Sequence, residues 1–245
     1  MKIAAPGHFG PVTGSLPASP AAIVRRLERT QRELLPAIRR WNKSLPPPSV
    51  VVRLADSEQR TLRSVALEPS VSAAVVRLAP EWRDDLAARA DLSALARVSP
   101  PARGRPRITP PRPAARLLAW YLEGQRRFGI RWQLLAAVNF VETAFGKVKN
   151  TSGAGARGPM QFEPATWKEY GLGGDIDNPR DAILAAANDL AANGGRRDER
   201  AALYRYNPSA LYVDAVLHYA DRMRANARAF YTYYCWRVYF HAARR

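Results

Sequence analysis

Apolar side chains recur every three or four positions along much of this 245-residue chain, which is the spacing of amphipathic helices. The first such pattern follows Ser19 and Pro20, a pair typical of a helix start. Pro36 lies inside the pattern, where its missing backbone N–H is expected to kink or split the helix. Three consecutive prolines at 46–48 should end the pattern.

The remainder of the first half carries shorter apolar patterns. They predict helices over residues 56–67, 70–79 and 81–98. The run VVVRL at 50–54 could instead form a short strand, because β-branched residues favour strands. Residues 99–113 contain six prolines and four arginines, which is typical of a semi-rigid linker rather than of a helix or a strand.

Helix signals are clearer in the second half. An amphipathic helix is predicted over residues 113–128 and is ended by Gly129, and a mostly apolar helix follows over 131–145. Residues 146–161 form a loop rich in glycine. Four further helices are predicted at 164–170, from the cap Asn178 to Gly194, at 198–206 and at 209–226. The chain shows no internal repeat and no convincing hairpin, so the predicted fold class is all-α.

Composition narrows the class of protein. Hydrophobic residues make up 47% of the chain, which is enough for a folded core. The sequence contains no run of 18 apolar residues, the length needed to span a membrane. The N-terminal residues contain proline and glycine where a signal peptide would be apolar, so no signal peptide is visible in this chain. With the single cysteine Cys235 and three scattered histidines, neither a disulfide nor a metal site is predicted, and no cofactor is expected.

Glu142 is the one charged residue near the end of the apolar helix over 131–145. It shares a helical face with Leu135, Val138 and Phe145, so its carboxyl group should point toward the core or into a cleft. Burial raises the pKa of a carboxyl group, and one that stays protonated near neutral pH can act as a general acid. A structural ion pair with a basic residue is the alternative interpretation.

The residues that follow suggest a groove around this acid. Glycines in the loop over 146–161 allow backbone to approach a ligand closely, and the loop carries Met160 and Gln161 just before the next helix. Tyr206 and Asn207 end a later helix with two hydrogen-bonding side chains. We therefore expect a single acid at the base of a groove with a polar lining.

Four motifs now carry a resemblance to a known family: FVETAFG, GARGPMQFEPATWKEYG, DAILAAANDLAANGG and ALYRYN. In order and spacing they resemble the bacterial soluble lytic murein transglycosylases, whose catalytic unit is the lysozyme-like SLT domain. The resemblance runs from about Leu117 to about Met223. The pattern and composition give a flexible segment at 1–18 and a Pro/Arg-rich linker at 99–113. The resemblance adds an SLT domain at 114–228, preceded by a helical N-terminal region at 19–98 and followed by an aromatic C-terminal strap at 229–245.

The resemblance also implies an activity, cleavage of the MurNAc-β-1,4-GlcNAc bond of peptidoglycan with formation of a 1,6-anhydroMurNAc end. Glu142 matches the single general acid/base of the family. One carboxyl group suffices there because the substrate's own C6 hydroxyl replaces the water that other glycosidases activate with a second carboxylate. The residues that match substrate-binding positions of the family are Thr143, Met160, Gln161, Tyr206 and Asn207.

Two alternative functions remain open at this point. A lysozyme-type muramidase on the same fold would hydrolyse the bond, and Glu163 could assist if it reached the groove, although we expect it at the exposed start of the next helix. A non-catalytic protein could use the same groove only to bind cell-wall glycan.

Location and partners follow from the resemblance and from the charge. The resemblance implies a protein of the cell envelope or the extracellular space that acts on peptidoglycan glycan strands, and we expect a monomer. The net charge of +17 is spread in pairs such as Arg25-Arg26 and Arg196-Arg197, which suits anionic wall polymers. No nucleic-acid-binding signature is present, so only weak, non-specific binding to nucleic acid is expected.

Overall fold

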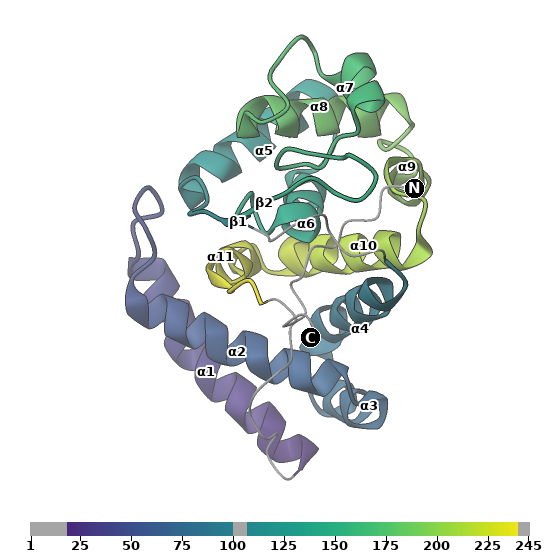
Figure 1. Ribbon diagram of the computed structural model, residues 1–245. Helices are drawn as coiled ribbons and strands as arrows, with labels where there is room; N and C mark the ends of the chain where they lie inside the picture. The colour runs from purple at the N-terminus through teal and green to yellow at the C-terminus, as the bar shows by residue number, and fades with distance from the viewer. Residues whose placement is uncertain (1–18, 100–106, 240–245) are drawn as a thin grey trace.

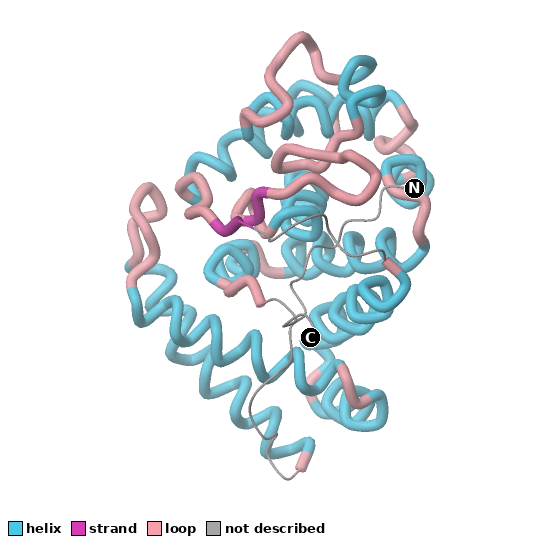
Figure 2. The backbone as a smooth tube through the Cα atoms, in the orientation of Figure 1, coloured by secondary structure: helices cyan, strands magenta, loops and turns pink. Residues whose placement is uncertain are grey.

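The computed structural model describes residues 19–99 and 107–239. Within these ranges the chain forms eleven α-helices, one short 3-10 helix and one two-stranded sheet, which confirms the predicted all-α class (Figures 1 and 2). The flexible segment expected at 1–18, part of the linker and the last residues of the expected strap lie outside the described residues.

The N-terminal region consists of helices in the lower half of Figure 1, where α1 and α2 lie side by side. Ser19 caps the first helix as predicted, because its side chain accepts a hydrogen bond from the backbone N–H of Ala22. These elements are α1 (Pro20–Arg40), α2 (Ser49–Ala66), α3 (Pro69–Leu78), η1 (Pro80–Trp82) and α4 (Arg83–Val98).

Two of the alternatives considered for this region were wrong: that Pro36 splits its helix, and that residues 50–54 form a strand. Helix α1 runs through Pro36 without being split, because the fully buried Leu34 and Ile38 hold both sides of it in the core. Their burial is worth about 1.5–3 kcal/mol each, which offsets the roughly 3 kcal/mol cost of an internal proline. The run at 50–54 is not a strand but the first turns of α2, with Val51 buried against the core.

The second half folds around a central helix. Helix α6 (Trp132–Thr143) is buried on every side from Leu134 onward, so its apolar residues cover the whole circumference rather than the single face that its spacing suggested. Gly129, with a φ of 74°, ends the preceding helix as predicted. The other helices of this half up to residue 225 are α5 (Ala114–Phe128), α7 (Pro164–Tyr170), α8 (Pro179–Ala192), α9 (Glu199–Tyr206) and α10 (Ala210–Ala225), of which α5, α8 and α10 pack on α6.

A small sheet joins the expected linker to the segment after α6. Strand β1 (Arg107–Ile108) pairs antiparallel with β2 (Val148–Lys149). The prediction that 99–113 contains no regular element was therefore wrong for residues 107–108, whose partner lies some forty positions away and leaves no local sequence signal. The pairing fixes the linker next to the start of the glycine-rich loop.

The aromatic C-terminal segment, expected as a strap packed on the domain, begins with a helix whose aromatic side chains are buried. Helix α11 (Arg228–Cys235) places Phe230 and Tyr233 in the core, and the ring of Tyr233 stacks on Phe140 of α6 with 5.3 Å between centroids. Trp236, directly after the helix, is 2% exposed. The aromatic residues of the tail therefore complete the core beside the central helix.

One continuous core joins the N-terminal helices to the second half. Helix α4 packs against α10, and Arg222 Nε of α10 donates to Asp85 Oδ2 of α4 at 2.8 Å. Tyr233 Oη donates to the other oxygen of the same carboxylate at 2.6 Å. The N-terminal helices therefore form part of the wall behind α10 and are not a separately packed unit.

Candidate active site

Glu142 lies next to the last residue of α6 and is 1% exposed. This confirms the prediction that its side chain points inward. Tyr212 Oη, from α10, donates a hydrogen bond to Glu142 Oε1 at 2.8 Å. A phenol that donates to a carboxylate stabilises the charged form of that carboxylate.

A second tyrosine, Tyr206, lies near enough to Glu142 for the charge of that carboxylate to act on it. Burial, followed by the negative charge of Glu142, raises the pKa of both Tyr206 and Tyr212 well above the usual value for a phenol. Both side chains therefore remain protonated hydrogen-bond donors across the physiological pH range. Tyr206 uses its hydroxyl to donate to the backbone oxygen of Met160 at 2.5 Å.

The backbone turns sharply directly after the acid. Ala144, Phe145 and Gly146 have φ values of 51°, 64° and 76°, so three successive residues adopt the left-handed region. Such a conformation costs a non-glycine residue on the order of 1–3 kcal/mol. The backbone N–H groups of Ala144 and Phe145 donate back to the last turn of α6, which fixes the helix end beside Glu142.

A buried chain of polar groups ties the glycine-rich loop to α6. Asn139 Nδ2 and Thr143 Oγ1 both donate to the backbone oxygen of Pro159, at 2.7 and 2.6 Å. Tyr121 Oη donates to Asn139 Oδ1 at 2.5 Å, and the N–H of Gly146 donates to Thr143 Oγ1 at 3.0 Å. Because every contact is buried, this chain fixes the position of the residues that follow Pro159.

The Met160–Gln161 segment lies in a strained turn. Met160 is fully buried, and Gln161 has a φ of 52° and donates through Nε2 to the backbone oxygens of Asn150 and Gly158. At Gly158 the φ is 76°, and a Cβ there would lie 2.1 Å from the backbone oxygen of Ile176. Only glycine fits this position, so the loop is built around it.

Asn207 ends α9 and is 1% exposed. Its backbone N–H donates to Leu203, as expected for a helix end. Its side-chain oxygen Oδ1 is buried and has no hydrogen-bond partner in the part of the chain that the structure describes. A buried acceptor without a donor is costly, so this oxygen is a candidate contact for a bound ligand.

A polar cavity of about 270 Å³ lies between α7, α8 and α9, and Tyr206 forms part of its wall. Glu163 lies at the N-cap position of α7, as predicted, but it is half-buried in the wall of this cavity rather than exposed, and its side chain makes no capping hydrogen bond. The residues that line it are Glu163, Thr166, Glu169, Tyr170, Asp189, Asn193, Arg205, Tyr206 and Pro208. Hydrogen-bonding groups dominate this lining, which suits a hydroxyl-rich ligand better than an apolar one.

Part of the chain that contains this site matches a known protein-family model. Residues 121–227 match the model described as the transglycosylase SLT domain. This chain carries an SLT domain. The matched range lies within the 114–228 that the motifs predicted, and it contains Glu142, Tyr206 and Tyr212. Neither a search of curated proteins nor a search of solved structures found a match.

The SLT domain indicates a transglycosylase-type enzyme that cleaves glycan, with peptidoglycan as the substrate of the family. A protein acting on that polymer works at the cell envelope or outside the cell. Each helix in the described ranges is too short or too polar to serve as a transmembrane span.

The structure brings some of the predicted site residues together directly. Tyr206 donates to the backbone oxygen of Met160 and lies within reach of the charge of Glu142, and Thr143 donates to the backbone oxygen of Pro159, the residue before Met160. Sequence reasoning missed Tyr212, the residue that donates to the acid. Nothing distinguishes it from the other nine tyrosines in the sequence except its place near the start of a helix that packs on α6.

Proposed function

We propose that this SLT domain is a lytic transglycosylase that cleaves the MurNAc-β-1,4-GlcNAc bond and leaves a 1,6-anhydroMurNAc end, with Glu142 as the single general acid/base. The observation that carries the proposal is the buried Glu142 carboxyl group, which accepts a hydrogen bond from a neutral Tyr212 inside a matched SLT domain. Such a group can hold a proton in one state and be stabilised as an anion in the next.

In the proposed reaction, the protonated Glu142 donates its proton to the glycosidic oxygen while the bond from this oxygen to C1 of MurNAc breaks. The N-acetyl group of the same sugar stabilises the positive charge that develops at C1. The Glu142 carboxylate then takes the proton from the C6 hydroxyl as its oxygen bonds to C1. Tyr212 stabilises the anion between these two steps, and no water is consumed.

The other site residues take positioning and binding roles in this proposal. Tyr206 and Thr143 hold Met160 and Gln161 at the acid through their contacts to the backbone of this loop. Met160 and Gln161, which are 0% and 3% exposed, would form the wall against which the sugar binds. The buried Oδ1 of Asn207 accepts a hydrogen bond from the glycan, which supplies the donor that the described chain lacks.

The rest of the chain supports this domain. We infer that the helical region at 19–98 braces α10, because α4 packs on that helix and contacts Arg222 through Asp85. The net charge of +17 would hold a monomeric enzyme on anionic wall polymers at the cell surface. Salt should then weaken binding to purified cell walls, since screened surface charges attract less strongly.

Product analysis of purified peptidoglycan digested with the full chain tests the proposal. Mass spectrometry of the soluble muropeptides should find 1,6-anhydro ends and no newly formed reducing ends. Reducing ends would establish a muramidase instead. Binding to the polymer without any soluble product, under conditions in which the protein is folded, would establish a glycan-binding protein.

A further inference from the structure

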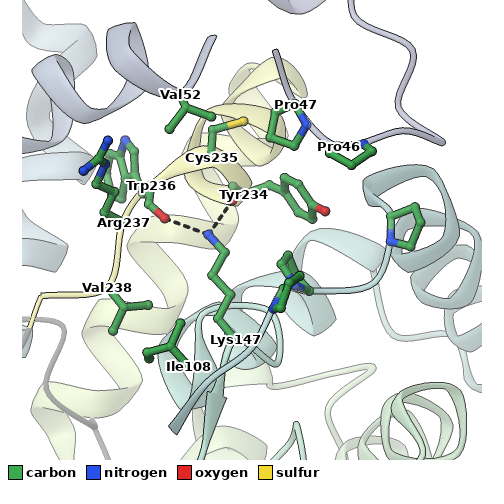
Figure 3. Close-up of a pocket in the computed structure, with 13 residues that line it drawn as sticks. Pro46, Pro47, Val52, Ile108, Lys147, Tyr234, Cys235, Trp236, Arg237 and Val238 are labelled. Atoms are coloured by element: carbon green, nitrogen blue, oxygen red, sulfur yellow. Dashed lines mark hydrogen bonds between the residues drawn. The ribbon is translucent and has the colours of Figure 1, made fainter. Parts of the chain in front are cut away.

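A second cavity, of about 440 Å³, lies where the N-terminal helices, β1 and the segment after α11 meet (Figure 3). It falls within the 300–1,000 Å³ range that is usual for small-molecule sites. Its lining is mostly apolar and consists of Pro46, Pro47, Val52, Ile108, Pro110, Pro111, Pro113, Lys147, Tyr234, Cys235, Trp236, Arg237 and Val238. None of these residues belongs to the proposed active site.

Lys147 places a cation in this apolar wall. Its Nζ donates to the backbone oxygens of Tyr234 and Trp236 at 2.6 and 2.7 Å, as Figure 3 shows, and lies 5.6 Å from the centre of the Tyr234 ring. These partners are neutral, and within the described residues no carboxylate forms an ion pair with Lys147. An ammonium group carries three N–H donors, so two carbonyl contacts leave the third available.

The electrostatics of the cavity favour an anion. Burial lowers the pKa of Lys147 to about 8, with a smaller opposing effect from Cys235, so the ammonium form still predominates at neutral pH. The other ionic side chain in the lining is Arg237, which reaches Asp56 at 3.7 Å, and the lining includes no aspartate or glutamate. A buried cation without a counterion is costly, and an anionic ligand would remove that cost.

We propose that this cavity binds a medium-chain fatty acid, with the alkyl chain against the proline and aromatic lining and the carboxylate paired with Lys147 Nζ. The apolar wall accounts for the chain, and Lys147, which has no carboxylate partner among the described residues, accounts for a single negative headgroup. This inference is independent of the proposed glycan cleavage, because the two sites share no residue.

Binding of a fluorescent fatty acid, dansylamino-undecanoic acid, to the full chain tests the proposal. Unlabelled decanoate should displace the probe at a concentration at least about tenfold lower than decanol, because only the carboxylate pairs with Lys147. The advantage of decanoate should diminish as the pH rises past about 8, where Lys147 loses its proton. Equal potency of the acid and the alcohol at neutral pH would overturn the proposal.

Two variants locate the binding. Ile108 lines the cavity and is 50% exposed, so Ile108→Trp should fill the cavity without disturbing the core and weaken probe binding at least about tenfold. Leu78→Trp is the matched control, because Leu78 is 58% exposed and lies outside the cavity; it should bind like the wild type. Lys147→Gln should abolish the preference for decanoate. Unchanged probe binding in a folded Ile108→Trp protein would contradict the assignment, even if Lys147→Gln failed to fold.

Discussion

Tyr212 Oη and Glu142 Oε1 lie 2.8 Å apart, which joins the start of α10 to the end of α6 across 70 positions of the chain. Helix α10 is held on its far side by α4 through the buried contact between Arg222 and Asp85. The N-terminal helices therefore help to set the position of the group that donates to the acid. A substitution that disrupts the packing of α4 on α10 should therefore also displace Tyr212 from Glu142.

Replacement of Tyr212 by phenylalanine removes the donor and keeps the ring. A hydrogen bond to a charged group is worth about 1.5–3 kcal/mol, so the rate of glycan cleavage should fall roughly 10- to 100-fold. Because the phenol stabilises the carboxylate, the pH–rate profile should also shift toward higher pH. Muropeptide release measured from pH 4 to 9 checks both effects. A lower rate with an unchanged profile would show that Tyr212 only supports the fold.

Tyr206→Phe tests whether the hydrogen bond from Tyr206 to the backbone oxygen of Met160 fixes the loop that contains Met160. The variant leaves the backbone oxygen of Met160 buried without its donor, which should lower the free energy of unfolding by about 1–3 kcal/mol and slow cleavage. Tyr204→Phe is the matched control, since this tyrosine lies on the same helix and is 52% exposed. Chemical denaturation of both variants, with muropeptide release, gives the comparison. Equal behaviour of the two would count against the role of Tyr206.

Alanine substitutions at Gly158 and Gly155 distinguish the cost of a steric clash from the cost of a left-handed backbone. Both have positive φ values, 76° and 88°, but a Cβ at 158 would lie 2.1 Å from the oxygen of Ile176, whereas nothing lies within 4 Å of a Cβ at 155. Gly155→Ala should cost about 1 kcal/mol for the left-handed backbone alone. Gly158→Ala should cost several kcal/mol and displace Gln161. Thermal unfolding of the two variants should therefore differ by many degrees; similar melting temperatures would contradict this account of the loop.

Glu58 should make stability depend on pH. Burial, followed by the nearby charge of Asp85, raises its pKa to about 8 from an ordinary 4.5, while hydrogen bonding from Gln31 and the charge of Arg222 oppose the rise. Between pH 4.5 and about 8, Glu58 is therefore protonated in the folded state and ionised in the unfolded state. Stability should thus be highest below about pH 4.5 as far as this group is concerned, and should fall as the pH rises to about 8.

The size of this effect follows from about 1.4 kcal/mol per pH unit, which gives roughly 3–5 kcal/mol across the whole range. Glu58→Gln should remove most of it, whereas Glu68→Gln, at an exposed position, should follow the wild type. Guanidinium unfolding at pH 5 and pH 8 measures the difference. A Glu58→Gln protein that loses as much stability as the wild type between these values would refute the prediction.

The sequence was most informative where the signals are local. The cap at Asn178, the stop at Gly129 and the inward Glu142 all follow from a few neighbouring residues, and the structure confirms them. Long-range packing decided the rest. The valines at 50–54 are helical because α2 packs along α1. Strand β1 forms through its pairing with β2, in which Lys149 lies opposite Arg107.

The same distinction holds for the site. Family motifs predicted Glu142 and Tyr206, but Asn139 and Tyr212 act through partners 20 and 70 residues away, which no spacing rule reveals. The one sequence feature that points to Asn139 is its amide side chain, which lies one turn before Thr143 in a mostly apolar helix.

The most direct test of the central claim compares Glu142→Gln with Glu68→Gln on purified peptidoglycan. Both variants replace one glutamate by its neutral amide, but only the first removes the group that exchanges a proton with the substrate. With both proteins folded and bound to the polymer, Glu142→Gln should release 1,6-anhydro muropeptides at least about a thousandfold more slowly than the wild type, while Glu68→Gln should match it. Release by Glu142→Gln within a few fold of the wild-type rate would contradict the assignment of Glu142 as the general acid/base.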